Sequence, residues 1–311
     1  MSGYRELVLA LNPVAYWRLG ESAGTVAVDE TGTQDGTYNG GITKGVTGAL
    51  TDDADTAADF DAVSGSYISV PTDAAFDAMD RVSVAGWFQI NVGASLTGTL
   101  LRRGSSGEHY FIRFTPAGKR PSWHVYNQAL AFVNIEHVAD LNDDLWHFAV
   151  GTWDGTNSRL YIDGLESTNS PQALAGTSIG GAGANIGIGS HADAGTSELM
   201  NGALDEVAIF RRALSAREIR DLYDRGVGNY YGSSRITLAE TRIVRNEGGV
   251  VQRVSINAVS TGTITLNDSI GTRLVLGANY PVGVYDFAIE FAGKIEVVTT
   301  AACDLTVFWS R

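Results

Sequence analysis

The stretch LDEVAIFRRALSAREIRDLYDRG, residues 204–226, carries the clearest helix signal in a chain that otherwise consists of short apolar runs and glycine-rich turns. Ser215 can accept a hydrogen bond from a free backbone N–H of the first helical turn. Glu218 follows three residues later and can reach back to the N-cap, which makes a capping box. Leu214 and Ile219 have the spacing of a hydrophobic staple. These signals predict a helix that begins directly after Ser215.

The same helix has one apolar side, which predicts that it covers a sheet. Ile219, Leu222 and Tyr223 lie at helical spacing and form a single stripe. Gly226 follows this stripe and is expected to end the helix in the left-handed conformation. The preceding residues, 202–210, alternate as a strand that contains two adjacent acids. We therefore predict a short surface helix directly after an acidic strand.

The composition favours an all-β protein with more than one domain. The 311 residues are enough for two domains, and they include 37 glycines but only six prolines. Asp, Asn, Gly, Ser and Thr fill the gaps between short apolar runs. This pattern is typical of many short strands joined by turns.

The net charge of −13 belongs entirely to the first 232 residues. Residues 233–311 hold seven basic and seven acidic side chains, whereas residues 1–232 hold 15 basic and 28 acidic ones. An acidic first domain argues against binding nucleic acid or an anionic membrane through bulk electrostatics. It fits calcium or neutral sugars as ligands. Alternatively, the acidity only keeps the protein in solution.

Cysteine content and hydropathy suggest where the chain is made. Cys303 is the only cysteine, which excludes an intramolecular disulfide and a cysteine-based zinc site. Residues 1–17, MSGYRELVLALNPVAYW, lack the basic, apolar and small-residue regions of a secretory signal peptide. No apolar run approaches the length that spans a membrane. We therefore expect synthesis in a cytoplasm, without membrane insertion.

The remaining elements are predicted to be strands, apart from a short helix over residues 4–12 that Pro13 closes. Strands of the first domain are expected at residues 15–21, 58–71 (two strands around a turn), 82–90, 109–114, 123–128, 145–166 (a hairpin with a DGTN turn), 184–190 and 202–210. A boundary is expected near residues 228–234. Seven further strands are predicted after it, at residues 235–244, 250–259, 262–268, 272–277, 284–293, 294–300 and 304–311.

Five blocks of this chain resemble laminin-G-like, concanavalin A-type jelly-roll domains in both order and spacing. The blocks are FDAVSGSYISVP (60–71), VSVAGWFQI (82–90), LWHFAVGTWDGTNSRLYIDG (145–164), ANIGIGS (184–190) and NGALDEVAIFRRALSAREIRDLY (201–223). The resemblance implies an antiparallel β-sandwich over residues 13–229, after an N-terminal arm or short helix at 1–12. A small β-sandwich or barrel at 233–311, for oligomerisation or attachment, is expected to follow. Trp87, Trp146 and Trp153 are expected to fill the space between the two sheets.

The resemblance also implies a calcium ion bound by carboxylates. Such domains bring an early Asp-rich loop close to the late acidic pair, which here means Asp29 and Asp35 with Asp205. Hard cations take several oxygen ligands of this kind. Glu206 is expected to point to the opposite face of its strand. The alternative is that these Asp residues form turns and keep solvated carboxylates.

A glycan site is expected where exposed aromatic rings lie beside polar groups. The predicted glycan-binding residues are Arg102, His109, Arg113 and Tyr126. His109, Phe111 and Arg113 share one face if their strand is regular, whereas Trp123 and His124 must point to opposite faces. The alternative is that one face of these strands is core and the other an ordinary surface.

No catalytic motif is found in the sequence, so we predict that the protein is not an enzyme. The chain lacks the Glu-x-Asp-x-Glu run that would place paired carboxylates on one face. It also lacks a nucleophile-elbow serine and a phosphate loop, and its five histidines have no metal-binding spacing.

The ends of the chain carry a further resemblance. Residues 4–21, YRELVLALNPVAYWRLGE, resemble the entry to laminin-G-like domains of bacteriophage structural proteins, and the C-terminal segment resembles small β-modules of tail or capsid appendages. This resemblance implies a virion structural protein made in a host cytoplasm, namely a tail or capsid appendage, fibre or decoration protein. Such a protein would contact other virion proteins and attach to a glycan on the host surface. It would assemble as a homo-oligomer, often a trimer. Its apolar finish, LTVFW (305–309), would pack between chains. The alternative is a free, monomeric carbohydrate-binding module, and a glycosidase comes third.

Overall fold

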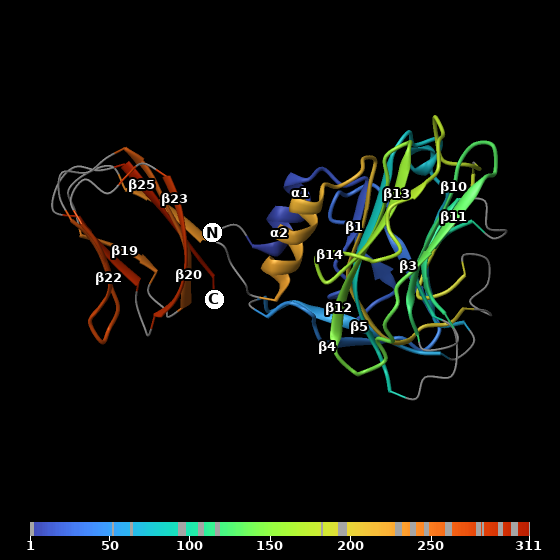
Figure 1. Cartoon of the computed structure of the whole chain (residues 1–311). Helices are drawn as coiled ribbons and strands as arrows, with labels where there is room; N and C mark the ends of the chain where they lie inside the picture. Colours follow the sequence, from blue (N-terminus) through green and yellow to red (C-terminus); the bar gives the residue numbers. More distant parts are fainter. Residues whose placement is uncertain are drawn as a thin grey trace. The chain divides into compact units, whose positions relative to one another are not determined.

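The computed structural model divides the chain into two compact units, Met1–Val227 and Gly228–Arg311 (Figure 1). The described residues are 3–51, 53–62, 65–92, 98–104, 109–115, 119–181, 183–191, 198–227, 232–236, 241–245, 249–258, 263–277, 281, 283–291, 295–299 and 304–310. The side chains of most residues after 231 lie outside the description, which there includes residues 263–277, 281 and 296–299.

The N-terminal unit consists of two antiparallel sheets. The larger sheet contains β1 (Ala15–Trp17), β4 (Thr43–Thr47), β5 (Thr56–Asp61), β7 (Val82–Ile90), β12 (Trp146–Trp153), β13 (Asn157–Ile162), β14 (Leu165–Glu166), β15 (Gln172–Ala173) and β17 (Asn201–Phe210). The smaller sheet contains β2 (Val26–Ala27), β3 (Gly36–Asn39), β6 (Tyr67–Val70), β8 (Thr99–Arg103), β9 (Tyr110–Phe114), β10 (Pro121–Tyr126), β11 (Phe132–Glu136) and β16 (Ile186–Ile188).

The strand order of both sheets confirms the predicted antiparallel sandwich. In the larger sheet the order is β14-β13-β12-β7-β17-β5-β4, with β1 also paired to β17 and β15 to β13. In the smaller sheet the order is β11-β10-β9-β8-β16-β6-β3-β2. A 3₁₀ helix, η1 (Ala74–Phe76), precedes β7. Strands that are far apart in sequence therefore lie side by side, as in a jelly roll.

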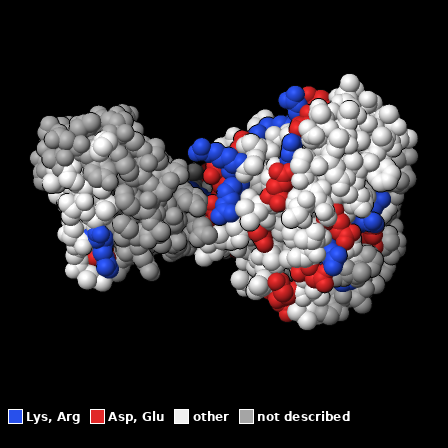
Figure 2. Space-filling view, viewed as in Figure 1, with Lys and Arg blue, Asp and Glu red and all other residues white. Residues whose placement is uncertain are grey.

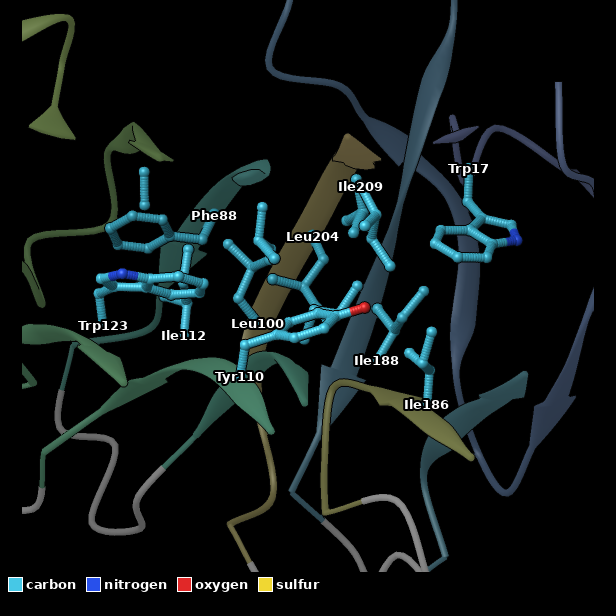
Figure 3. Packing of buried hydrophobic residues seen from close by; sticks show 14 of the residues in the cluster. Trp17, Phe88, Leu100, Tyr110, Ile112, Trp123, Ile186, Ile188, Leu204 and Ile209 are labelled. Atoms are coloured by element: carbon cyan, nitrogen blue, oxygen red, sulfur yellow. The ribbon is translucent and has the colours of Figure 1, made fainter. Parts of the chain in front are cut away.

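The main core fills the space between the two sheets (Figure 3). Strand β7 shows how the sequence builds it, because Val82, Val84 and Phe88 point inward at a spacing of two residues. Trp17 and Trp123 are fully buried in the same core. Removal of this apolar surface from water is the main driving force for folding of the sandwich.

A second apolar cluster covers the outer face of the larger sheet. The helices α1 (Tyr4–Ala10) and α2 (Ala216–Gly226) lie on that face, away from the smaller sheet (Figure 1). Their side chains pack on the outward residues of β7, β12 and β17. The members of this cluster include Tyr4, Val8, Ile219 and Leu222 from the helices and Trp87, Phe148, Val150 and Phe210 from the sheet. The apolar stripe predicted for the second helix is thus confirmed.

The start of α2 is as predicted, but its end is not. Ser215 accepts from the backbone N–H of Glu218, and the Glu218 side chain accepts from the Ser215 backbone N–H, which confirms the capping box. Gly226 is not a left-handed cap, because it is the last helical residue and Val227 follows with φ −82°. A Cβ at Gly226 would lie 2.1 Å from Cζ2 of Trp87. Close packing of the helix on this indole therefore requires glycine here.

The three tryptophans predicted to lie between the sheets have three different environments. Trp153 is in the main core, as expected. Trp87 lies on the outer face under the helices, because it alternates with the inward residues of β7. Trp146, at the start of β12, is only partly buried on the same outer face. The prediction was wrong for the last two.

The C-terminal unit contains two four-stranded sheets in its described part. The strands are β18 (Gly232–Ile236), β19 (Thr241–Arg245), β20 (Gly249–Ala258), β21 (Ile264–Asn267), β22 (Thr272–Leu276), β23 (Gly283–Phe291), β24 (Ile295–Thr299) and β25 (Asp304–Ser310). The orders are β18-β25-β20-β23 and β19-β24-β21-β22, and the two sheets face each other (Figure 1). This confirms a small β-sandwich. The side chains of the predicted apolar finish, 305–309, and residue Cys303 lie outside the described set.

Within the described residues, neither helix has the length and apolar character needed to cross a membrane.

Candidate functional site

The outer face of the smaller sheet brings together two of the predicted glycan-binding residues. Arg102 of β8 donates to Oε2 of Glu198 over 2.9 Å, and Arg113 of β9 donates to Oε1 of the same carboxylate over 3.0 Å. The Arg102 guanidinium also lies 4.2 Å from the ring centre of Phe111. Cation–π contact and two charge-assisted hydrogen bonds therefore fix both arginines.

His124 of β10 packs at the centre of this face. Its ring stacks on Phe111 at 4.3 Å between centroids, and its Nε2 lies 2.7 Å from Oγ of Ser122. Burial, together with the nearby Arg113 and Arg102, lowers the pKa of His124 to about 3. The ring is therefore neutral at physiological pH. Trp123, the preceding residue, points into the main core, so the predicted opposite orientation of the two is confirmed.

His109 is separated from this cluster, contrary to the predicted shared face. Its Nδ1 lies 2.7 Å from Nη1 of Arg103, and the side chain packs against Gly181. Burial and then the charge of Arg103 lower the pKa of His109 to about 4. The backbone pairing continues through His109, whose carbonyl accepts from the N–H of Tyr126 over 2.8 Å, but its ring lies against Arg103 and Gly181 instead of Phe111.

Tyr126 lies at the open edge of the same face. It pairs across the ladder with Phe132 of β11, the edge strand, and the two rings stack at 4.9 Å with 21° between their planes. Phe132 is 56% exposed. Asn134, two residues further along β11, is exposed on the same face, and its Oδ1 accepts from Ser122 over 2.6 Å. An aromatic surface thus lies next to polar groups at a solvent-exposed edge.

Sequence reasoning missed three residues of this face: Glu198, Phe132 and Asn134. The alternation in FVNIE, 132–136, would have placed Phe132 and Asn134 on one face. Glu198 has no such signal, because it lies in a loop with φ +53° and reaches the arginines only through the tertiary fold.

A β-bulge changes the position of the late acidic pair. The register of β17 on β7 shifts after Asp205, and Glu206 has φ +54°. Asp205 lies opposite Trp87 on the outer face, and Glu206 contacts Tyr16 of the same outer cluster. The two acids therefore do not point to opposite faces, because the extra residue of the bulge interrupts the alternation.

Arg18 neutralises part of this buried acidic group. Its Nε and Nη2 donate to Oε1 of Glu206 over 2.9 and 2.7 Å, and its Nη2 also reaches Asp53 over 2.9 Å. Burial raises the pKa of Glu206 to about 7 although Arg18 and Tyr16 favour its charged form. Asp55 lies 2.9 Å from Nε of the same guanidinium. The cluster has an internal cation that balances only part of its negative charge.

Asp205 is the least satisfied member of the cluster. Its Oδ2 accepts from the backbone N–H of Ala49 over 2.8 Å, whereas its buried Oδ1 has no hydrogen-bond partner in the described structure. Burial, followed by the charge of Glu206, raises the pKa of Asp205 well above its ordinary value. Because no cation of the described residues pairs directly with it, Asp205 is the group that holds a proton most readily.

The predicted calcium ligands Asp29 and Asp35 have a different role from Asp205. The Asp29 carboxylate accepts from the backbone N–H groups of Tyr16, Thr31, Thr33 and Gln34. Asp35 accepts from the backbone N–H of Asp29 over 2.8 Å. Both thus organise the loop, as the turn-forming alternative predicted, but Asp29 is only 2% exposed, so its carboxylate is not solvated as that alternative expected. Among the described residues no three or more His, Cys, Asp or Glu side chains form a group that could hold a metal ion, so Asp29, Asp35 and Asp205 do not meet in such a group.

Ion pairs organise much of the surface charge of the N-terminal unit. Figure 2 shows acidic and basic side chains interspersed over the visible face, with basic side chains gathered over α2. The pairs include Arg159 with Asp154 at 3.0 Å and Arg212 with Glu218 at 2.8 Å. Such pairs contribute little stability individually.

The fold matches solved structures of toxin binding domains. The binding domain of Paraclostridial Mosquitocidal Protein 1 has a TM-score of 0.53 at 14% identity, with 82% of this chain and 61% of that one covered. The binding domain of Botulinum neurotoxin serotype G also has a TM-score of 0.53, at 13% identity, with 89% of this chain and 65% of that one covered. This chain therefore spans less than two thirds of either domain. At these identities the likeness establishes the fold alone.

A match to a family model shows to which superfamily the chain belongs. No curated protein sequence matches the chain. The model of the Concanavalin A-like lectin/glucanases superfamily matches residues 61–220, which is about half of the 311 residues. The matched region runs from the end of β5 into α2 and includes most of both sheets. The chain belongs to the concanavalin A-like lectin/glucanases superfamily.

Proposed function

We propose that the N-terminal unit is a glycan-binding domain whose binding surface is the open edge of the smaller sheet. The observation that carries this proposal is the exposed ring of Phe132 stacked on Tyr126. A large exposed aromatic surface next to polar side chains offers an apolar platform and hydrogen bonds at once, which a sugar ring requires. The family description, which names lectins and glucanases, supports the same ligand class.

The polar residues beside the platform favour a neutral glycan. Glu198 pairs with both Arg102 and Arg113 and so neutralises one of their two positive charges, which weakens the attraction of this face for an anionic sugar. His124 is neutral because burial lowers its pKa. Asn134, whose Oδ1 is held by Ser122, directs its amide N–H₂ away from that bond and can donate to a hydroxyl.

The proposed role is binding without catalysis. The adjacent acids of β17, Asp205 and Glu206, are buried, with about 1% of each residue exposed. Glu206 is bound to Arg18 and Tyr16. Carboxylates in this position cannot flank a glycosidic bond of a bound polysaccharide.

A glycan array tests this proposal. The full chain is expected to bind one class of neutral glycan, and Phe132→Ala is expected to abolish that signal. Leu165→Ala is the matched control, because Leu165 is 64% exposed on the other sheet and its loss leaves the smaller sheet unchanged. Leu165→Ala should change stability by less than about 0.5 kcal/mol, whereas Phe132→Ala also loses the ring stack on Tyr126, which is worth about 0.5–1.5 kcal/mol. Equal binding by Phe132→Ala and the wild type would contradict the proposal.

The biological setting we propose is a virion appendage that uses this domain to attach to a host surface. Its support is the resemblance of residues 4–21 and of the C-terminal segment to phage structural proteins. The solved structures described above are toxin domains, so they do not bear on it. The mass of the full chain in solution separates the alternatives. A stable homo-oligomer, such as a trimer, favours the virion component, and a monomer favours the free carbohydrate-binding module.

A further inference from the structure

We propose a second ligand site, for a neutral sugar ring, in a hollow on the outer face of the larger sheet. The hollow has a volume of about 420 Å³, within the range of small-molecule sites. Trp146, Gln89 and Asp59 line it together with the end of β4. The inference takes its ligand class from the proposed function, but it concerns the opposite sheet and separate residues.

The register of four strands places the lining residues in one row. Trp146 of β12 pairs with Gln89 of β7, Gln89 pairs with Ala203 of β17, and Ala203 pairs with Asp59 of β5. Directly paired residues of an antiparallel ladder point to the same face. The next row along, with Trp87 at its centre, is the one that the helices cover. The hollow therefore lies where the helical cover ends.

Trp146 differs from the other tryptophans whose side chains the structure describes in the hydrogen bonding of its indole N–H. The other four donate to a partner inside the protein: Trp17 to Gln34 O, Trp87 to Tyr4 Oη, Trp123 to Ser158 Oγ and Trp153 to Leu174 O, over 2.8 to 3.0 Å. Trp146 donates to none of the described residues, and its ring is only partly buried. Buried indoles usually satisfy this donor. Trp146 thus presents both an apolar face and a hydrogen-bond donor to the hollow.

Asp59 lies at the other end of the row as a partly buried carboxylate. Its carboxylate forms no hydrogen bond or ion pair with any residue that the structure describes, and the residue is intermediate in exposure. Burial, followed by the charge of Asp61, raises its pKa. A carboxylate that has lost part of its water without gaining a partner is costly. Hydroxyl groups of a ligand would supply the missing hydrogen bonds.

Gln89 is already oriented for a role in binding. Its Nε2 donates to the backbone carbonyl of Asp144 over 2.6 Å, which fixes the amide. Its Oε1 accepts from no described residue, so the oxygen remains a second acceptor between Trp146 and Asp59. One donor, two acceptors and an indole face in a single row match a sugar ring, which combines an apolar C–H face with a rim of hydroxyls.

The charge of the hollow selects against other ligand classes. Its lining includes one carboxylate and no basic side chain, so it would repel phosphate, sulfate or an acidic sugar. An ammonium ligand would suit Asp59, but recognition of such groups relies on several aromatic rings, and the lining supplies only Trp146. A neutral sugar uses every polar group of the row.

The indole N–H signals in a ¹H–¹⁵N correlation spectrum of the full chain provide the test. Loss of one signal in Trp146→Phe assigns Trp146. The probes are glucose, galactose, mannose and N-acetylglucosamine at millimolar concentrations. The Trp146 signal is expected to shift saturably with at least one of them, while the four buried indoles stay in place. Asp59→Asn is expected to weaken the affinity at least about tenfold.

Two controls separate this site from the first one and from a general charge effect. Asp80→Asn removes one exposed carboxylate just before β7, at the end of that strand opposite to Gln89, and should leave the affinity unchanged. Phe132→Ala should leave the Trp146 shift unchanged, even if it abolishes binding at the smaller sheet. No shift with any of the four sugars would overturn the inference. A shift with tetramethylammonium alone, or one insensitive to Asp59→Asn, would overturn it as well.

Discussion

Arg18 donates two hydrogen bonds to a single oxygen of Glu206, from Nε over 2.9 Å and from Nη2 over 2.7 Å, across 188 residues of sequence. These bonds join the segment that follows β1 to the bulge of β17, a strand in the interior of the larger sheet. The Glu206 side chain is completely buried and that of Arg18 is 16% exposed. The early and late segments of the sandwich are thus held together by a charge pair within the fold.

Arg18→Met is therefore expected to destabilise the N-terminal unit by about 3–5 kcal/mol, because it leaves a buried carboxylate without its cation. The double variant Arg18→Met/Glu206→Gln should recover much of this loss, since neither charge then remains. Thermal unfolding followed by circular dichroism measures both. Equal stability of Arg18→Met and the wild type would show that the pair is not buried in solution.

Asp205→Asn is expected to stabilise the protein at pH 8 and to have no effect near pH 4. The folded-state pKa of Asp205 is raised above its unfolded value, so its stabilising contribution is present below about pH 4 and is lost as the pH rises through the folded pKa. The variant avoids the cost of a buried charge, of order 1–3 kcal/mol at pH 8. Its amide oxygen can still accept from Ala49.

The melting temperature at both pH values, with and without a chelator, measures this effect. Loss of stability in Asp205→Asn at pH 8 would contradict the prediction. If the chelator removed the stability difference between Asp205→Asn and the wild type, a cation bound at Asp205 in the wild type would be its cause.

Gly226→Ala is expected to cost about 1–3 kcal/mol, although alanine is the better helix former. The added methyl group would overlap Cζ2 of Trp87, so the helix would have to move away from the sheet. Gly277→Ala is the control, because no atom lies within 4 Å of the position that its Cβ would take. Denaturant unfolding measures the difference. A stabilised Gly226→Ala variant would mean that α2 does not pack closely on Trp87.

His147 is expected to titrate above its ordinary pKa of about 6.5. Burial alone lowers its pKa, but the carboxylates of Asp163 at 2.8 Å and Asp143 at 3.2 Å more than offset this effect. The resulting stabilisation is complete below about pH 6.5 and is lost as the pH rises through the folded pKa. Asp163→Asn should lower the pKa of His147.

NMR titration of the histidine ring protons measures this prediction. His124, whose pKa burial lowers to about 3, serves as the internal reference because it should stay neutral throughout the neutral range. A His147 midpoint below that of model peptides would contradict the prediction.

The sandwich fold could be predicted from the sequence because the signals for its strands and for α2 lie within single elements. Alternation in β7 and the capping box at Ser215 each depend on residues within one element, and both are present in the structure. The end of the same helix was predicted wrongly, because glycine is required at position 226 by close packing against Trp87, which is distant in the sequence. Local rules describe the conformation of a glycine but not the atom that packs against it.

The site was less predictable, because it depends on tertiary contacts and on one irregularity. Arg102 and Arg113 were both named as candidate residues, and the structure places them side by side, but the carboxylate between them, Glu198, comes from a loop. The bulge at Glu206 reversed its expected direction, and the sequence contains no signal for it. Trp146 was predicted to be a core residue, and the sequence of its own strand does not show that it lies in the row beyond the helices, where its ring is only partly buried.

The most direct test of glycan binding at the smaller sheet is an equilibrium titration of the full chain with the glycan that binds best on the array. We expect Phe132→Ala to raise the Kd at least about tenfold, which corresponds to about 1.4 kcal/mol, while the protein stays folded, and Leu165→Ala to leave the Kd unchanged. Wild-type affinity in Phe132→Ala, or an equal loss in both variants, would contradict the assignment of this edge as the binding surface.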